Sequence, residues 1–203
     1  MREIIFAFSL TLIAGLSTGI GSVIAFLAKK TNKRFLAISL GFSAGVMIYV
    51  SMIEIFVKAK DSLVSDLGEK MGAWVTVLAF FGGMFLIALI DHLIPAEENP
   101  HEMKNVVADN EDIVKKDKLI RMGLLTALAM AIHNFPEGIA TFIGALNDPE
   151  MGAGITFAIA IHNIPEGIAI AIPIYYATKS KGKALLYATL SGMSEVLGAI
   201  LCL

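Results

Sequence analysis

The sequence contains the stretch AMAIHNFPEGIA at residues 129–140 and nearly repeats it as AIAIHNIPEGIA at residues 158–169. Ten of the twelve positions are identical, at an offset of 29 residues. Similarity between two apolar segments is common because few residue types occur in them. A shared order of His, Asn, Pro, Glu and Gly is not common, so this repeat guides the predictions of both fold and function.

The rest of the chain is unusually apolar. It has 203 residues, of which 56% are hydrophobic and 17% charged, whereas soluble domains carry about 25% charged residues. We therefore expect an all-α, polytopic membrane helix bundle that forms a single domain over residues 1–203. A membrane helix needs about 20 mostly apolar residues. Six spans meet this requirement, at residues 4–28, 35–57, 72–95, 119–146, 151–177 and 184–203.

Composition also excludes several functions. The net charge of -2 provides no basic field for a nucleic-acid partner. Cys202 is the single cysteine, so neither a disulfide framework nor a cysteine zinc cluster can form within the chain. The lipid bilayer is an expected partner, with no organic cofactor; a homodimer is left open.

The distribution of basic residues predicts the orientation. Of the 16 Lys and Arg residues, 12 lie around the first, third and fifth connections between spans. Because basic loops stay in the cytoplasm, the N-terminus is expected outside and loop 96–118 inside. The acidic residues of that loop fit a solvated linker, and a loose metal-collecting loop is the alternative.

Each copy of the repeat places polar side chains on one helix face near the middle of a span. His133, Asn134 and Glu137 share a face because residues three and four apart are neighbours on a helix. His162, Asn163 and Glu166 do the same in the next span. Ionisable groups at the bilayer centre are costly and usually functional. Two copies at one depth on antiparallel helices predict a metal or ion site; polar contacts between packed helices are the alternative.

Proline and glycine shape the same helices. Pro136 and Pro165 lack an N–H, so helices 4 and 5 are expected to be kinked around the metal site. Gly138 and Gly167 leave room for close backbone approach. Small residues four apart also allow close helix packing. Such pairs occur on the first two helices, as Gly15 with Gly19 and Gly41 with Gly45.

The ligand types narrow the choice of metal. Imidazole with carboxylate and without thiolate suits zinc, iron, manganese or cobalt, whereas calcium and magnesium favour all-oxygen shells. Glu195 lies in the sixth span, 29 residues after Glu166, and could add a third carboxylate or simply pack there. Met47, in the second span, could be a soft ligand, although methionine is more often core filler.

Together, these segments resemble one family. HNFPEG and HNIPEG, with GFSAGVM at residues 41–47 and SGMSEVLG at residues 191–198, are similar to the ZIP (Zrt/Irt-like) divalent metal transporters, in particular the bacterial zinc-uptake branch. The resemblance implies metal uptake into the cytoplasm across the bacterial inner membrane. Zinc is the expected cargo, with iron, manganese, cobalt and cadmium as alternatives. The family pattern has eight membrane helices, and this sequence reaches Leu203 at the end of the sixth.

The resemblance also implies a binuclear site. One metal would be held by His133, Glu137, His162 and Glu166, with Met47 alongside. The neighbouring metal would be held by Asn134, Glu137, Asn163, Glu166 and Glu195. Glu137 and Glu166 would bridge the two metals.

Two other functions compete with transport. An intramembrane metal-dependent hydrolase could use helical His and Glu to activate water. The sequence lacks an HExxH arrangement, and the repeat supplies a symmetric, carboxylate-rich shell instead of an open three-ligand site. We therefore expect no enzymatic activity and assign no catalytic residue. The second alternative is a truncated metal-binding fragment that does not transport.

Overall fold

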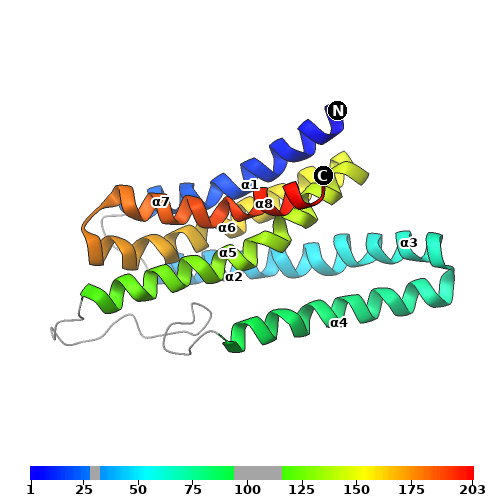
Figure 1. The fold of residues 1–203 in the computed structure, drawn as a ribbon, viewed down its shortest axis with the longest axis horizontal. Helices are drawn as coiled ribbons and strands as arrows, with labels where there is room; N and C mark the ends of the chain where they lie inside the picture. The colour runs from blue at the N-terminus through cyan, green and yellow to red at the C-terminus, as the bar shows by residue number, and fades with distance from the viewer. Residues whose placement is uncertain (28–32, 94–115) are drawn as a thin grey trace.

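The computed structural model describes residues 1–27, 33–93 and 116–203, and every element within these ranges is a helix (Figure 1). In a bilayer the backbone must satisfy its own hydrogen bonds, which helices do internally. The helices are α1 Arg2–Leu27, α2 Lys33–Tyr49, the π-helix η1 Val50–Ile55, α3 Phe56–Leu67, α4 Glu69–Leu93, α5 Lys116–Asn147, α6 Pro149–Thr178, α7 Lys181–Gly192 and α8 Ser194–Leu201. Six of the resulting segments are long and apolar enough to span a membrane, which confirms the predicted helix bundle. The linker predicted at 96–118 lies outside the described residues, except for 116–118, which begin α5.

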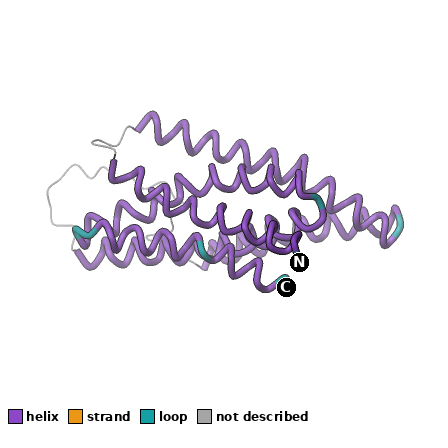
Figure 2. The backbone as a smooth tube through the Cα atoms, turned by 90° about the horizontal axis from the view of Figure 1, so that it is seen from above, coloured by secondary structure: helices purple, strands orange, loops and turns teal. Residues whose placement is uncertain are grey.

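Helix α6 is the centre of the bundle. It contacts α1, α2, α5 and α7, and in its most apolar window 56% of the residues are buried. Helices α2, η1, α3 and α4 instead form a long hairpin beside the bundle (Figures 1 and 2). In the most apolar part of each arm of this hairpin only 11% of the residues are buried. Most of the hairpin's apolar surface therefore faces outward.

Local sequence determines where α6 begins and ends. The carboxylate of Asp148 accepts hydrogen bonds from the backbone N–H groups of Glu150 and Met151, both at 3.1 Å. Pro149 follows at the first helical position, where its missing N–H costs nothing. At the other end Lys179 adopts a left-handed conformation with φ 56° and ends the helix. The turn between α5 and α6 is therefore very short and holds the two copies of the repeat antiparallel.

Glycines allow the close approaches that assemble the site. A Cβ on Gly138 would collide with the backbone of Glu195, and a Cβ on Gly167 would collide with the carbonyl of Thr18. Both predicted approaches are thus confirmed. Their effect is to bring α8 against α5 and α1 against α6 at the level of the repeated motif.

The prediction for the paired glycines is confirmed for the pair on α1. Gly15 and Gly19 lie against α7, where a Cβ would meet the Gly192 carbonyl or the Thr189 hydroxyl. A Cβ on Gly41 or Gly45 would meet nothing within 4 Å among the described residues. Among the described residues α2 turns that face away from the bundle, and the packing prediction for Gly41 and Gly45 stays a prediction.

Two boundaries also differ from the prediction. The second span does not stop at residue 57: η1 and α3 continue it to Leu67, and Gly68 reverses the chain with φ 83°. The sixth span is interrupted at Met193, between α7 and α8, which places Glu195 in the first turn of α8. Helices α5 and α6 run through Pro136 and Pro165 without interruption, and the kink expected in each helix stays a prediction.

The turns between the helices lie at the two ends of the bundle. The N-terminus and the α3–α4 and α5–α6 turns lie toward one end, and the α6–α7 turn lies at the other (Figure 1). At the first end Lys58 of α3 donates to Asp148 in the α5–α6 turn, joining the hairpin to the bundle. This arrangement agrees with the alternation of sides predicted from the basic residues.

Candidate metal centre

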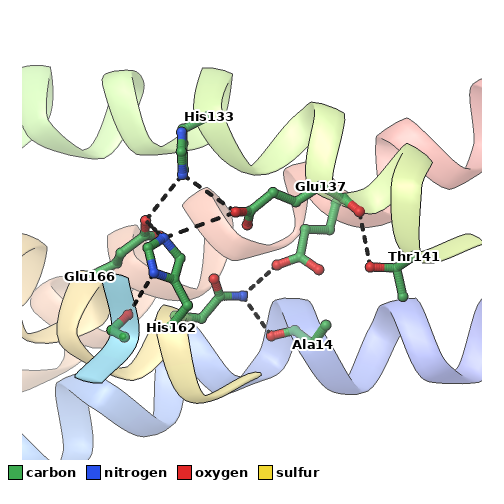
Figure 3. A network of polar contacts seen from close by, with 9 residues as sticks. Ala14, His133, Glu137, Thr141, His162 and Glu166 are labelled. Atoms are coloured by element: carbon green, nitrogen blue, oxygen red, sulfur yellow. Dashed lines mark hydrogen bonds and ion pairs between the residues drawn. The ribbon is translucent and has the colours of Figure 1, made fainter. Parts of the chain in front are cut away.

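The two repeat copies face each other across the α5–α6 interface. His133 and Glu137 project from α5 toward His162 and Glu166 of α6 (Figure 3). We call these four residues the imidazole–carboxylate cluster. The two imidazole ring centres are 5.7 Å apart. The i, i+4 spacing within each copy and the antiparallel pairing of the copies therefore bring two imidazoles and two carboxylates to one point.

The nitrogen–oxygen distances in this cluster are short. Nε2 of His133 lies 3.4 Å from Glu137 Oε1 and 3.6 Å from Glu166 Oε1. Nε2 of His162 lies 3.0 Å from Glu166 Oε1 and 4.0 Å from Glu137 Oε1. Ligand atoms bound tetrahedrally to zinc at about 2.0–2.2 Å lie roughly 3.3–3.6 Å from one another. Both distances from Nε2 of His133 are close to this range, whereas the distance of 4.0 Å between His162 and Glu137 exceeds it.

Three residues of this cluster bring their ligand atoms close together. Ligand atoms of His133, His162 and Glu166 all lie within 4.8 Å of one another. Both glutamates are buried, with side chains only 9% and 8% exposed for Glu137 and Glu166. His133 is more open, with 31% of its side chain exposed.

A second polar group lies beside the first, and we call it the amide–carboxylate cluster: Asn134, Asn163 and Glu195. The amide nitrogen of Asn163 donates to the Ala14 carbonyl at 2.9 Å and to Oε1 of Glu195. With its amide nitrogen facing the nearby acceptors, Asn134 donates to the Met130 carbonyl at 3.2 Å and to Oε2 of Glu166 at 3.0 Å. All three residues of this cluster are fully buried.

Unsatisfied buried atoms concentrate in these two clusters. Among the described residues six buried side-chain atoms lack a hydrogen-bond partner, and five of them belong to the clusters. They are both carboxylate oxygens of Glu137, Nε2 of His162, Oδ1 of Asn163 and Oε2 of Glu195. Buried polar atoms are almost always paired, and exceptions often mark an ion site. These are also atoms that can offer a lone pair, so the donor set fits a cation.

The orientation of each amide matters for this chemistry. Because the nitrogen of Asn163 is held by Ala14 and Glu195, its unpartnered Oδ1 is the atom left to meet a ligand. Glu166 divides its two oxygens in a similar way: Oε1 faces the imidazoles and Oε2 accepts from Asn134. One carboxylate therefore touches both clusters.

Met47 occupies a different environment from the other predicted ligands. It is partly buried and packs against a hydrophobic group on α1, η1 and α6, composed of Ala14, Val50, Ile155, Ala158 and Ile159. These contacts match the core-filling interpretation of the residue. Its role as a ligand stays a prediction.

Sequence reasoning missed two contributors to the site. The first is the Ala14 carbonyl, a backbone group that no motif reveals. The second is Ser43 of α2, whose Oγ lies 2.6 Å from Nδ1 of His162. A signal for Ser43 did exist, because it precedes Met47 by four residues within the same GFSAGVM segment. Thr141 also caps the carbonyl of Glu137 within α5, at 2.9 Å (Figure 3).

Comparisons with known proteins connect this chain to one family. Residues 90–203 match the family model described as ZIP Zinc transporter. The chain is 58% identical to a protein of Clostridium perfringens named "Zinc transporter ZupT", over 99% of this chain and 75% of that protein. Proteins with the same name in Streptococcus mutans and Chlorobaculum parvum are 63% and 62% identical, covering 96% and 98% of this chain and 73% and 74% of theirs.

Proposed function

This chain belongs to the ZIP zinc transporter family, and from that premise we propose that its two polar clusters carry Zn²⁺ across the membrane. It is a multi-pass membrane transporter of divalent metal ions, as the sequence predicted, and the family is one of transporters rather than hydrolases. The observation that supports this route most strongly is the convergence of two imidazoles and two carboxylates midway along α5 and α6.

The proposed path uses two adjacent metal positions. The imidazole–carboxylate cluster holds one ion through two nitrogens and two carboxylates. The amide–carboxylate cluster holds the other through the oxygens of Asn134, Asn163 and Glu195. Glu137 and Glu166 bridge the positions, because each carboxylate has two oxygens and Glu166 already turns one toward each cluster. Three carboxylates also offset much of the charge of two divalent cations.

The direction of transport is proposed to be inward, with the N-terminus outside and the chain in the bacterial plasma membrane. The excess of Lys and Arg at the first, third and fifth connections supports this orientation. A probe cysteine in the α5–α6 turn, at residues 147–150, should react with an impermeant reagent from outside, and one at Ser180 should not. Both would be introduced in a Cys202→Ser background, and the reverse pattern would refute the orientation.

Uptake by the purified chain in proteoliposomes tests the function. Addition of Zn²⁺ outside should load the vesicles, and Glu166→Gln should reduce loading to background. Glu69→Gln is the matched control, because Glu69 is an exposed carboxylate in the first turn of α4. Normal zinc loading in Glu166→Gln would contradict the proposed path. Parallel assays with Fe²⁺, Mn²⁺, Co²⁺ and Cd²⁺ would rank the other cargoes; these metals and the homodimer stay predictions.

A further inference from the structure

Ser43 occupies an unusual position for a serine. Its side chain is 2% exposed, and among the α2 side chains that the structure describes it is the one that is buried. Its neighbour Phe42 is 58% exposed. Helix α2 therefore turns Phe42 outward and the small hydroxyl of Ser43 toward the bundle, where small residues let membrane helices approach closely.

The contact made by this hydroxyl is also distinctive. Many buried hydroxyls in the chain bond to a carbonyl of their own helix, as Ser22 does to Gly19 at 2.7 Å and Thr156 to Gly152 at 2.7 Å. Ser43 Oγ reaches across to Nδ1 of His162, which is 119 residues away in sequence. The contact joins the hairpin to the imidazole–carboxylate cluster.

The geometry fixes which ring atom remains for a metal. The two nitrogens of a neutral imidazole differ, one carrying the proton and the other a lone pair. Nδ1 of His162 is occupied by Ser43, whereas Nε2 is buried without a hydrogen-bond partner and faces Glu166 at 3.0 Å. If Nδ1 carries the proton and donates it to Ser43 Oγ, then Nε2 presents its lone pair to the cluster.

We propose that Ser43 is a positioning residue for metal binding: its Oγ accepts the Nδ1–H of His162, which holds the ring and aims the Nε2 lone pair at the metal position. This inference rests on the proposed zinc path and adds to it a residue that touches no metal. Partners of this kind typically change metal affinity by 10–100-fold. Ser43 acts through His162 alone, so its effect must disappear when His162 is absent.

A double-mutant cycle on the full chain tests this dependence. Zn²⁺ dissociation constants would be measured by competition with a chelator in detergent for Ser43→Ala in three backgrounds. We expect a 10–100-fold loss of affinity in the parent and in His133→Ala, and a change of less than twofold in His162→Ala. Ser22→Ala is the matched control, since it removes a buried serine hydroxyl that donates to the Gly19 carbonyl of its own helix, and it should leave affinity unchanged.

The position of the His162 ring proton can be measured in the parent protein, without any substitution. In zinc-free parent protein with neutral imidazoles, ¹⁵N NMR should show His162 protonated at Nδ1. A proton on Nε2, an unchanged affinity in Ser43→Ala, or an equal loss in the His162→Ala background would each overturn the role of Ser43. A parent chain that binds no Zn²⁺ would instead overturn the proposed function itself, so the two failures are distinguishable.

Discussion

The two copies of the repeat have nearly the same sequence but different supports. The first copy lies on α5, where Asn134 bonds to a carbonyl of its own helix and to Glu166. The second lies on the central helix α6, where Asn163 bonds to α1 and α8, and His162 bonds to α2. His133 is 31% exposed and His162 is 19% exposed. The comparison teaches that identical local sequence reproduces the ligand set, whereas tertiary packing decides how firmly each ligand is held.

The strongest test asks whether the two glutamates are equivalent despite these different supports. Glu137→Ala and Glu166→Ala should each remove both bound metals and lower Zn²⁺ transport by at least about a hundredfold, because each carboxylate is proposed to bridge. The metal-free variants should still fold, since an unpaired glutamate at mid-membrane is itself costly. Metal stoichiometry and uptake measure the effect. Two metals retained in Glu137→Ala at near-parental affinity would disprove bridging.

Substitution of the two asparagines should lower the stability of the chain by different amounts. Asn163→Ala leaves the buried Glu195 without its amide donor, while its other oxygen already lacks a partner, and such a loss costs about 1–3 kcal/mol. Asn134→Ala should cost less, about 1 kcal/mol, because Glu166 loses one donor but keeps both imidazoles beside its Oε1. Thermal unfolding of the metal-free chain in detergent gives the order. Equal losses would mean that the two amides have equivalent structural roles.

Substitution of the two histidines should lower the affinity for Zn²⁺ by different amounts. His162→Ala should weaken Zn²⁺ binding about tenfold more than His133→Ala, because a ligand already held in position pays less entropy on binding and so contributes more. Chelator competition measures both constants. A larger loss in His133→Ala would show that the more exposed copy dominates binding.

The smallest effect is expected at the turn that joins the copies. A hydrogen bond from Lys58, and then the backbone N–H of Met151, lower the pKa of Asp148. A lowered pKa adds stability that is fully present above the ordinary pKa of aspartate and is lost as the pH falls through the lowered value. The pair is exposed, so Asp148→Asn should reduce the unfolding temperature only slightly at neutral pH. The difference from the parent should vanish in acid; a difference that persists there would contradict this assignment.

Much of the site was accessible from sequence because it depends on local spacing. His133 with Glu137, and His162 with Glu166, face the same way through helix geometry alone, and the short turn at Asp148 aligns the copies. Ser43 was missed because its spacing to Met47 indicates a shared helix face but not the partner, which lies 119 positions away in the sequence. The extent of α3 was missed for another reason: hydropathy marks where apolar residues end, whereas the helix continues through polar ones to Leu67.

The π-helix η1 gives the hairpin an angular offset. An α-helix advances about 100° per residue, and a π-helical turn accommodates one residue more than an α-helical turn. Residues 50–55 therefore shift the rotational phase between α2, which carries Ser43, and α3, which carries Lys58. In a regular α-helix without the extra residue, Ser43 could not face His162 while Lys58 faces Asp148. Deleting one residue from η1 would rotate Lys58 away from Asp148 by about a quarter of a turn and leave Ser43 at His162. This short π-helix therefore sets the rotation of α3 relative to α2, so that both contacts can form at once.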